Sequence, residues 1–398
     1  MLKHAPMRPE LQEWISQRFS DRNAVSDAFF PQEAHPLAHA CRKMFERFDR
    51  GGRLLAFGRG AYATDAQHVS VEFVHPVIVG KRALPAMDLS LAFERWIEAV
   101  LAPEDIVMGF GPPKGDARVL RALRSARSRG ALAFALPGED ADYAVTAPSS
   151  DPHVHQEMIE ILTHTLYETV HVFFEHREMG HDVGAASFLY PFLGERTAPQ
   201  ESLVAEVAGS ILMKAQDARA LRDQVVASQT PAIASATVAI ASELKAGGKL
   251  ILFGNGGSAT DATDWALDCV MPEDDSRPIP AVSLSLEPAV ITAIANDVGT
   301  DVIFLRQLVA QARPHDVAIG LSTSGGSKNI VAALEEARKR GMLTVALLGY
   351  DGGEIVRRGL ADFPIVVHCD YIPRIQEVQG SIYHIIREGL EMLSRDAA

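Results

Sequence analysis

The chain repeats itself, and this repeat restricts it to folds built from two similar halves. Residues 51–65 read GGRLLAFGRGAYATD, and residues 247–261 read GGKLILFGNGGSATD. Two further pairs of segments match in the same order along the chain: 105–136 with 316–347, and 156–164 with 376–384. Chance similarity rarely keeps both order and pattern, so we interpret the chain as a tandem duplication. Its 398 residues are enough for two domains.

Each copy alternates short apolar segments with amphipathic ones. The expected strands are 54–57, 106–108 and 132–136 in the first copy, and 250–253, 317–320, 344–348 and 365–367 in the second. The expected helices include 37–48 and 154–174 in the first copy, and 233–245 and 375–393 in the second. Apolar runs of four to six residues between helices indicate buried parallel strands. The predicted fold class is therefore α/β: two tandem doubly wound domains, each a parallel sheet flanked by helices.

The domain boundaries are read from a change in pattern between the copies. The stretch 177–200 lacks periodicity and is rich in turn-forming residues. We expect a first domain over 1–175, a linker over 176–200 and a second domain over 201–398. The second domain is expected to begin with a helical lead-in over 201–228.

Composition and charge exclude several partner classes. There are 38 Lys and Arg against 51 Asp and Glu, which gives a net charge of −13 and disfavours nucleic acid and anionic membranes as partners. The sequence contains no run of 18 or more apolar residues, so it predicts no membrane span. The N-terminus lacks the apolar core of a signal peptide. Three cysteines without a CxxC pair favour a reducing, cytoplasmic compartment.

Two glycine- and serine-rich loops in the second copy predict a phosphate site. The segments GNGGSATD (254–261) and STSGGSKN (322–329) each lie between an expected strand and an expected helix. Free backbone amides and hydroxyls at helix N-termini suit a phosphate monoester, and both loops belong at the carboxyl edge of the sheet. Either loop alone could be an ordinary turn and helix cap. The two together favour phosphate binding.

The corresponding loops of the first copy have lost much of this character. GRGAYATD (58–65) has Arg59 in place of Asn, and GPPKGDAR (111–118) brings in two prolines that have no N–H to donate. Asp116 stands where the second copy has Ser327. Lys114 and Arg118 could still attract an anion. We nevertheless expect no phosphate site there, because the backbone donors are reduced.

The second copy resembles the phosphoheptose isomerases of the sugar isomerase (SIS) superfamily. The resemblance covers roughly 201–398 and is carried by GNGGSATDATDWALD, AIANDVG, STSGGSKNIVAALEEARKRGM, GYDGG and PRIQE. The first copy, over about 35–175, is similar to the same domain in degenerate form. The resemblance implies a Rossmann-like fold, interconversion of sedoheptulose 7-phosphate with a heptose 7-phosphate, a bound zinc or another divalent metal, and a tetramer of SIS domains. For this chain it implies a homodimer that forms a pseudo-tetramer.

The resemblance also implies which residues contact the phosphosugar. These are Asn255, Gly256, Gly257, Ser258, Asn296, Asp297, Ser322, Thr323, Ser324, Ser327 and Gln376. All of them match the residue types that the family uses.

The implied metal ligands are divided between the copies. The family uses a His and a Glu four residues later, then a Gln and a His on the last helix. The first copy has all four types, at His68, Glu72, Gln156 and His164, with His155 as an alternative to Gln156 if the register differs by one. In the second copy these positions are Asp264, Asp268, Gln376 and His384, which is a weaker set.

The ligand types suit a divalent metal on physical grounds as well. His68 and Glu72 are four residues apart, so they share a helix face about 6 Å apart. An imidazole, a carboxylate, an amide and a second imidazole form a mixed N/O set for zinc or a similar ion. Gln156 and His164 lie about 12 Å apart along one helix, so both can reach one ion only if the side chains lean together or come from different chains.

Isomerisation of a ketose needs a base, an acid and stabilisation of the enediolate oxygen. Glu72 or Asp268 is the expected base, and His164 or His384 the expected acid. Because one copy keeps the metal ligands and the other keeps the loops, we expect a composite site that uses metal from the first copy and phosphate loops from the second.

Two other functions remain open. One is a non-catalytic phosphosugar-binding or scaffold protein, because relatives of the phosphoheptose isomerases act as assembly factors and the copy with intact loops has lost the His and Glu. The other is isomerisation of a different ketose phosphate or of a hexosamine phosphate, for which tandem SIS domains are common.

Overall fold

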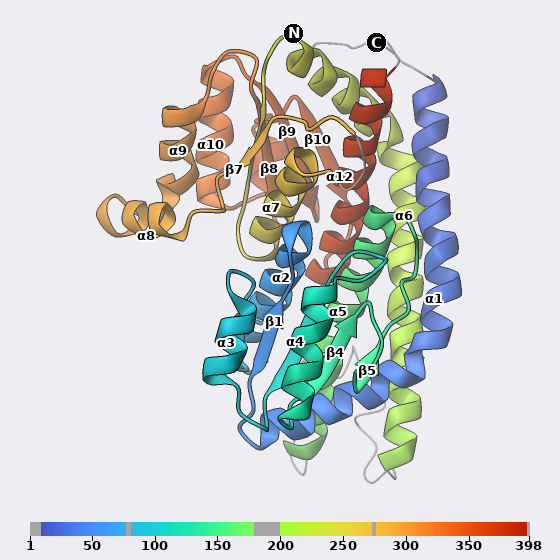
Figure 1. Cartoon of the computed structure of the whole chain (residues 1–398). Helices are drawn as coiled ribbons and strands as arrows, with labels where there is room; N and C mark the ends of the chain where they lie inside the picture. The colour runs from blue at the N-terminus through green and yellow to red at the C-terminus, as the bar shows by residue number, and fades with distance from the viewer. Residues whose placement is uncertain (1–8, 77–80, 179–199, 273–275, 396–398) are drawn as a thin grey trace. The chain divides into compact units, whose positions relative to one another are not determined.

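The computed structural model describes residues 9–76, 81–178, 200–272 and 276–395. It contains two compact units (Figure 1). The N-terminal unit is Ala24–Arg219, and the C-terminal unit combines the described residues up to Asn23 with those from Ala220 onward. The expected linker at 176–200 lies mostly outside the described residues, since helix α5 (Pro152–Glu178) ends before it and helix α6 (Gln200–Lys245) begins at its last residue.

The division into units does not follow the expected boundaries of 1–175 and 201–398. Helix α1 (Pro9–Asp49) gives its first part to the C-terminal unit and the rest to the N-terminal unit. Helix α6 belongs to the N-terminal unit up to Arg219 and to the C-terminal unit from Ala220 onward. The reason is visible in the packing of α1, where Leu11, Ile15 and Phe19 are buried in the core of the C-terminal unit. A hydrophobic stripe at i, i+4 and i+8 shows that a helix packs against something, but not against which sheet.

The N-terminal unit contains a five-stranded parallel sheet with helices on both faces (Figure 1). The strand order is β2-β1-β3-β4-β5. Besides α1, α5 and α6, its elements are β1 (Leu54–Phe57), a short 3-10 turn (Gly60–Tyr62), α2 (Ala63–Val74), β2 (Ala86–Asp88), α3 (Phe93–Val100), β3 (Ile106–Phe110), α4 (Ala117–Ser128), β4 (Leu132–Leu136) and β5 (Tyr143–Ala144).

The C-terminal unit repeats this architecture. Its parallel sheet has the order β10-β9-β8-β6-β7, which matches the first sheet strand for strand. Its elements are β6 (Leu250–Gly254), α7 (Gly257–Val270), β7 (Ala281–Ser283), α8 (Pro288–Asp297), a 3-10 turn (Thr300–Val302), α9 (Ile303–Gln311), β8 (Val317–Ser322), α10 (Lys328–Lys339), β9 (Leu343–Gly349), α11 (Gly353–Arg357), β10 (Phe363–Val367) and α12 (Ile372–Arg395).

Each sheet separates two apolar layers. In β1, Leu54 and Ala56 join the core on one face, and Leu55 and Phe57 join the core on the other. The strands of the C-terminal unit alternate in the same way between two cores. Both faces are buried, so the central strands read as continuous apolar runs. The predicted fold class, two doubly wound α/β domains, is confirmed.

Several elements differ from the sequence-based expectations. The helices expected at 37–48 and 233–245 are the ends of α1 and α6, which continue through Pro31, Pro36 and Pro231. A proline removes one backbone hydrogen bond from a helix. Tertiary packing of the helix against the rest of the fold compensates for that loss. The edge strands β2, β5 and β7 were not expected, because strands of two or three residues carry too little apolar pattern.

One described helix passes the length and hydropathy criteria for a membrane span, although the sequence predicted none. It is Val204–Lys245, with 39% of its most apolar window buried. Core helices of globular proteins satisfy the same criteria, and buried residues of α6 belong to the cores of both units.

Candidate functional site

The two serine- and glycine-rich loops of the C-terminal unit lie side by side at one edge of its sheet. They follow β6 and β8, which pair directly in the sheet. The side-chain amides of Asn255 and Asn329 join the loops by two reciprocal hydrogen bonds of 2.9 Å. Ligands bind at this carboxyl edge in doubly wound sheets. The structure therefore brings the first loop and the second loop together, as the sequence predicted.

The second loop has a defined internal geometry. The Ser322 hydroxyl accepts a hydrogen bond from the backbone N–H of Gly325 at 3.1 Å, and the Ser324 hydroxyl accepts one from Gly326 at 3.3 Å. Gly325 has φ +60°, and a Cβ there would lie 2.2 Å from the carbonyl oxygen of Gly352. The GYDGG segment thus packs directly against this loop, and only glycine fits at position 325.

The helices that follow both loops begin without a capping side chain. Gly256 precedes α7, and Ser327 precedes α10 without a side-chain hydrogen bond to the helix. The first N–H groups of a helix need an acceptor, and an anion can supply it. Both helix N-termini are therefore suited to a phosphate group.

In the N-terminal unit, the carboxylate of Asp116 lies at the helix N-terminus that corresponds to the start of α10. Asp116 caps α4 by accepting hydrogen bonds from the N–H groups of Arg118 and Val119 at 2.7 Å and 3.2 Å. The Arg59 guanidinium contacts Asp116 at 2.9 Å. Burial alone would raise the pKa of Asp116, but the bonds from the two N–H groups and from Arg59 lower it overall.

The charges of this first-copy loop are thus neutralised internally. Arg118, which the sequence left as a possible anion ligand, instead forms a bidentate pair with Glu94 at 2.5 Å and 3.0 Å. The expected lack of a phosphate site in the N-terminal unit stays a prediction.

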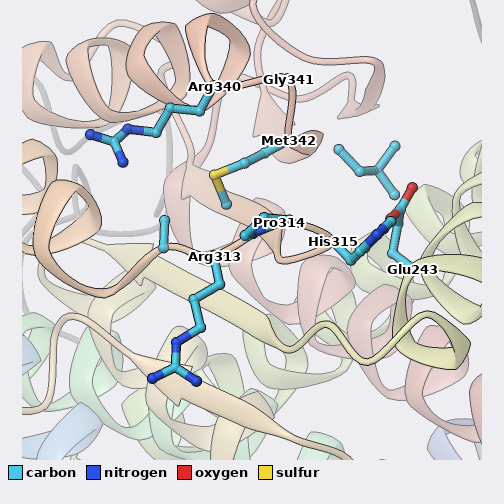
Figure 2. Close-up of a pocket in the computed structure, with 9 residues that line it drawn as sticks. Glu243, Arg313, Pro314, His315, Arg340, Gly341 and Met342 are labelled. Atoms are coloured by element: carbon cyan, nitrogen blue, oxygen red, sulfur yellow. The ribbon is translucent and has the colours of Figure 1, made fainter.

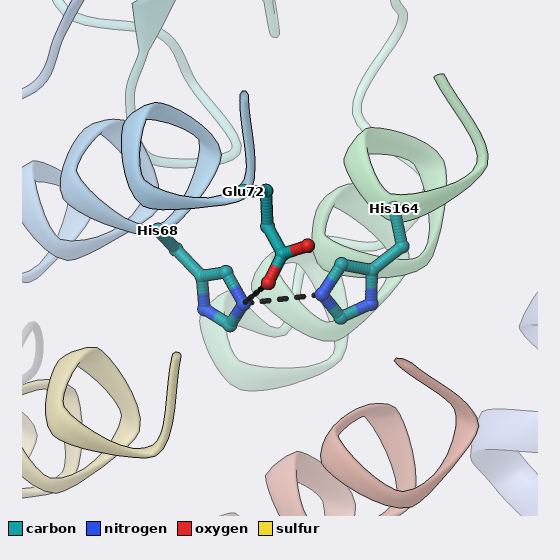
Figure 3. Close-up of side chains that lie close together, drawn as sticks. All are labelled: His68, Glu72 and His164. Carbon is teal, nitrogen blue, oxygen red and sulfur yellow. Dashed lines mark hydrogen bonds and ion pairs between the residues drawn. The ribbon is translucent and has the colours of Figure 1, made fainter. Parts of the chain in front are cut away.

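Three of the four expected metal ligands of the first copy meet in the N-terminal unit. Figure 3 shows His68 and Glu72 from α2 and His164 from α5 pointing at one another. The two imidazole Nε2 atoms lie 3.1 Å apart, and His68 Nε2 lies 3.9 Å from Glu72 Oε1. All three side chains are buried.

These residues fit a zinc ion. Two atoms that share one zinc ion must lie within about 4.2 Å, twice the usual bond length. Both measured distances satisfy this limit. Two imidazole nitrogens and one carboxylate oxygen are also a common protein ligand set for zinc.

The fourth expected ligand makes a different contact. The Gln156 side-chain amide donates to the carboxylate of Asp65 at 3.2 Å. The alternative ligand, His155, bonds through Nε2 to the carbonyl oxygen of Gly111 at 3.1 Å. Gln156 and His164 are two helical turns apart on α5. They therefore contact different residues of α2, Asp65 and His68 respectively.

The weaker set of the second copy also forms a group. His384 Nε2 lies 3.2 Å from Asp268 Oδ2 and 3.6 Å from Asp264 Oδ2. The Tyr383 hydroxyl donates to Asp264 at 2.7 Å. With two carboxylates and one imidazole, this set suits harder divalent ions as well as zinc. It also pairs a carboxylate with an imidazole, as proton transfer requires.

The remaining expected residues are placed as follows. Gln376 is buried on α12, and the described residues offer no hydrogen-bond partner to its Oε1. Asn296 and Asp297 are exposed at the end of α8, where the Asn296 amide donates to the Asp297 carboxylate at 2.7 Å.

The structure adds residues to this site that the sequence had not singled out. Asn329 joins the loops, Tyr383 holds Asp264, and Asp65 holds Gln156. A signal existed for Asp65, because the ATD triplet is identical in both copies. None existed for Tyr383, whose partner is remote in the sequence.

A family model described as the SIS domain matches residues 215–349. The phosphoheptose isomerase of Citrifermentans bemidjiense is 45% identical over 163 residues, which are 41% of this chain and 84% of that protein. The phosphoheptose isomerase of Trichlorobacter lovleyi is 41% identical over 182 residues, 46% of this chain and 92% of that protein.

A solved structure is similar to both halves of the chain. It is the C-terminal domain of glucosamine-fructose-6-phosphate aminotransferase from Francisella tularensis, with a TM-score of 0.52 and 10% identity. The likeness covers 93% of this chain and 96% of that chain, and at this identity it shows the fold alone. The identity to the curated relatives extends over most of their own length, and on that ground the chain belongs to the phosphoheptose isomerase family of SIS-domain proteins.

Proposed function

We propose that the protein isomerises a phosphorylated sugar between its ketose and aldose forms, with sedoheptulose 7-phosphate as the first substrate to test. The observation that carries the proposal is the pair of loops at 254–258 and 322–327, joined by Asn255 and Asn329 beside two uncapped helix N-termini. The family membership supports the same reaction class. The phosphate lies away from the reacting carbons, so its binding provides orientation.

Asp268 and His384 are the proposed acid/base pair, because they are in the same unit as these loops. The Asp268 carboxylate removes the proton from the hydroxyl-bearing carbon beside the carbonyl. The electron pair forms the enediolate, and the His384 imidazolium protonates the carbonyl oxygen. Asp268 returns its proton to the neighbouring carbon, and His384 recovers one from the hydroxyl that becomes the new carbonyl.

His68, Glu72 and His164 are the proposed zinc ligands. A divalent metal held by these residues would supply a Lewis acid within the N-terminal unit. The chain's own contribution is to bury three converging side chains, which favours the ion over water. Loss of the ion from His68→Ala, measured by elemental analysis of the purified protein, tests this assignment.

The isomerase proposal is tested by assaying the full chain with sedoheptulose 7-phosphate and added zinc. Ser324→Ala is expected to raise the KM, and Asp268→Asn to reduce the kcat, because one binds and the other transfers a proton. Lys114→Ala, in the corresponding loop of the N-terminal unit, is the matched control and should leave both constants unchanged. If Glu72→Gln abolishes proton exchange while Asp268→Asn does not, the acid/base pair is Glu72 with His164 instead.

A non-catalytic sugar-phosphate-binding role is the second candidate. It is favoured by one observation: Asp264 and Asp268 stand in the intact-loop unit where the resemblance implies a His and a Glu. Saturable binding of sedoheptulose 7-phosphate by the zinc-loaded protein, without solvent proton exchange, would establish this role and refute catalysis.

We also propose that the protein is a cytoplasmic homodimer. The free cysteines Cys41, Cys269 and Cys369 fit a reducing compartment. Helix α8 has no buried residue, and Leu286 and Val290 expose 49% and 39% of their surface. Light scattering should give twice the 43.1 kDa chain mass, and Val290→Glu should shift it to the monomer. Leu91→Glu, on an exposed leucine of the N-terminal unit, is the control.

A further inference from the structure

A cavity of about 460 Å³ lies at the amino edge of the C-terminal sheet, opposite the serine-rich loops (Figure 2). It is formed by the end of α6 and by the segments that precede β8 and β9. Its lining includes Glu243, Pro314, His315, Gly341, Met342 and Leu343. None of these residues takes part in the proposed isomerase reaction.

The N-terminal unit shows what occupies the corresponding place there. The backbone bond from Gly52 to the Arg47 carbonyl, 2.9 Å, corresponds to that from Gly248 to the Glu243 carbonyl, 3.1 Å. Arg47 is therefore the counterpart of Glu243. By the alignment of 105–136 with 316–347, extended to the residues just before it, Pro103 and Gly130 are the counterparts of Pro314 and Gly341.

Arg47 fills its site with a guanidinium group. Its Nη1 donates to the carbonyl oxygens of Pro103 at 2.5 Å and Gly130 at 3.0 Å. It also lies 3.7 Å from the Glu104 carboxylate. One cation thus satisfies two carbonyl groups and a carboxylate.

In the C-terminal unit the side chain at this position has the opposite charge. An ionised Glu243 accepts hydrogen bonds and cannot donate to the carbonyl groups of Pro314 and Gly341. Its Oε2 lies 2.9 Å from His315 Nδ1, which orients the carboxylate. By the same alignment His315 is the counterpart of Glu104, so the carboxylate of the Arg47 site is absent here. The cavity keeps the two carbonyl groups and has the carboxylate of Glu243, without the guanidinium group that Arg47 supplies.

We propose that this cavity binds the guanidinium or ammonium group of a small cationic ligand. The cationic group lies between the Glu243 carboxylate and the carbonyl oxygens of Pro314 and Gly341. A short apolar stem packs on Met342 and Leu343. Figure 2 shows the guanidinium ends of Arg313 and Arg340 pointing away from Glu243, and Arg340 Nε pairs with Glu336 at 2.7 Å.

The test uses two probes of similar length and opposite charge, butylguanidinium and pentanoate, titrated into the full chain by calorimetry. Butylguanidinium is expected to bind. Glu243→Arg, which supplies the guanidinium from within as Arg47 does, should weaken that binding about tenfold or more. Glu243→Gln, which keeps the side-chain size, should weaken it in the same direction and serves if the arginine variant fails to fold.

Glu335→Gln is the matched control, because Glu335 and its partners Arg358 and Lys339 lie outside the cavity lining, so the variant removes one negative charge and should leave binding unchanged. The proposal is overturned if the unsubstituted protein does not bind butylguanidinium, or if pentanoate binds better. It is also overturned if Glu243→Gln binds as well as the unsubstituted protein, or if Glu335→Gln weakens binding equally. Isomerase activity should be the same in all these variants, since the cavity is not part of that site.

Discussion

At the scale of single residues, burial decides which side chains can change charge. His155 on α5 has 1% of its surface exposed, and its Nε2 donates to the carbonyl oxygen of Gly111. Desolvation lowers the pKa of His155 to about 4, against 6.5 for the ordinary side chain, although the bond to Gly111 opposes the shift. The folded N-terminal unit therefore holds this imidazole neutral.

We predict a stability loss below pH 6.5 that depends on His155. Below this pH the unfolded chain binds a proton at His155 that the folded chain binds only near pH 4, so folding becomes less favourable as the pH falls. The full effect of the shift is roughly 3 kcal/mol. Urea unfolding at pH 7 and pH 4.5 should show a smaller pH-dependent difference for His155→Gln than for the unsubstituted protein. An identical difference would mean that His155 is not held neutral.

Gly325 is the residue whose backbone shape the second loop requires. With φ +60° and the Gly352 carbonyl at 2.2 Å from an added Cβ, Gly325→Ala must displace the loop. We predict that this variant weakens phosphosugar binding strongly, because Ser322 and Ser324 move with the loop. The measurement is calorimetric titration with sedoheptulose 7-phosphate, with circular dichroism to confirm folding. Gly341→Ala, where φ is +72° and the added Cβ meets nothing within 4 Å, is the control for backbone strain alone.

At the scale of elements, the two units differ most at one helix N-terminus. Helix α10 begins without a side-chain cap, whereas α4 is capped by Asp116. The same strand–loop–helix motif can thus leave the first N–H groups of its helix available to a ligand, or it can satisfy them with a side chain of the chain itself. This choice depends on a single position, Ser327 or Asp116.

We predict that Asp116→Ala lowers the free energy of unfolding of the N-terminal unit by about 1 kcal/mol, through loss of the cap. Arg59→Ala should cost less, since the Arg59 side chain is 47% exposed and exposed ion pairs contribute little. Because the pKa of Asp116 is lowered, its contribution is present above pH 4 and is lost as the pH falls below the ordinary aspartate value. Denaturant unfolding of both variants checks this, and a larger effect of Arg59→Ala would contradict it.

At the scale of the whole molecule, the compact units do not coincide with the repeated halves of the sequence. The C-terminal unit includes residues up to Asn23, and Arg18 Nε and Arg22 Nη2 of α1 pair with Glu388 of α12 at 2.7 Å and 2.8 Å. Arg22 is fully buried in this arrangement. The first turns of α1 therefore belong to the fold of the last 179 residues, Ala220–Ala398.

We predict that deletion of residues 1–23 unfolds the C-terminal unit and leaves the N-terminal unit folded. Burial of Leu11, Ile15 and Phe19 contributes about 2 kcal/mol each, which together approach the stability of a typical domain. Limited proteolysis with mass spectrometry should show cleavage within 220–398 in the deletion variant. Resistance of that region equal to the full chain would refute the prediction. Addition of a peptide covering 1–23 should restore protection.

The sequence by itself determined the doubly wound α/β class and the two adjacent glycine- and serine-rich loops. Apolar runs and glycine-rich turns are local signals, and the rule that parallel strands end at one edge places the loops together. The meeting of His68, Glu72 and His164 was predictable for a related reason, since two of them share a helix face.

Only the tertiary structure decided which partners the remaining side chains take. Gln156 contacts Asp65, Tyr383 contacts Asp264, and Asp116 caps α4 with Arg59 beside it. The tertiary structure also decided that α1 and α6 each contribute one part to the N-terminal unit and the other part to the C-terminal unit. A helix pattern states that a face will be buried, but the partner is chosen by packing between segments remote in the sequence, and no local pattern encodes that choice.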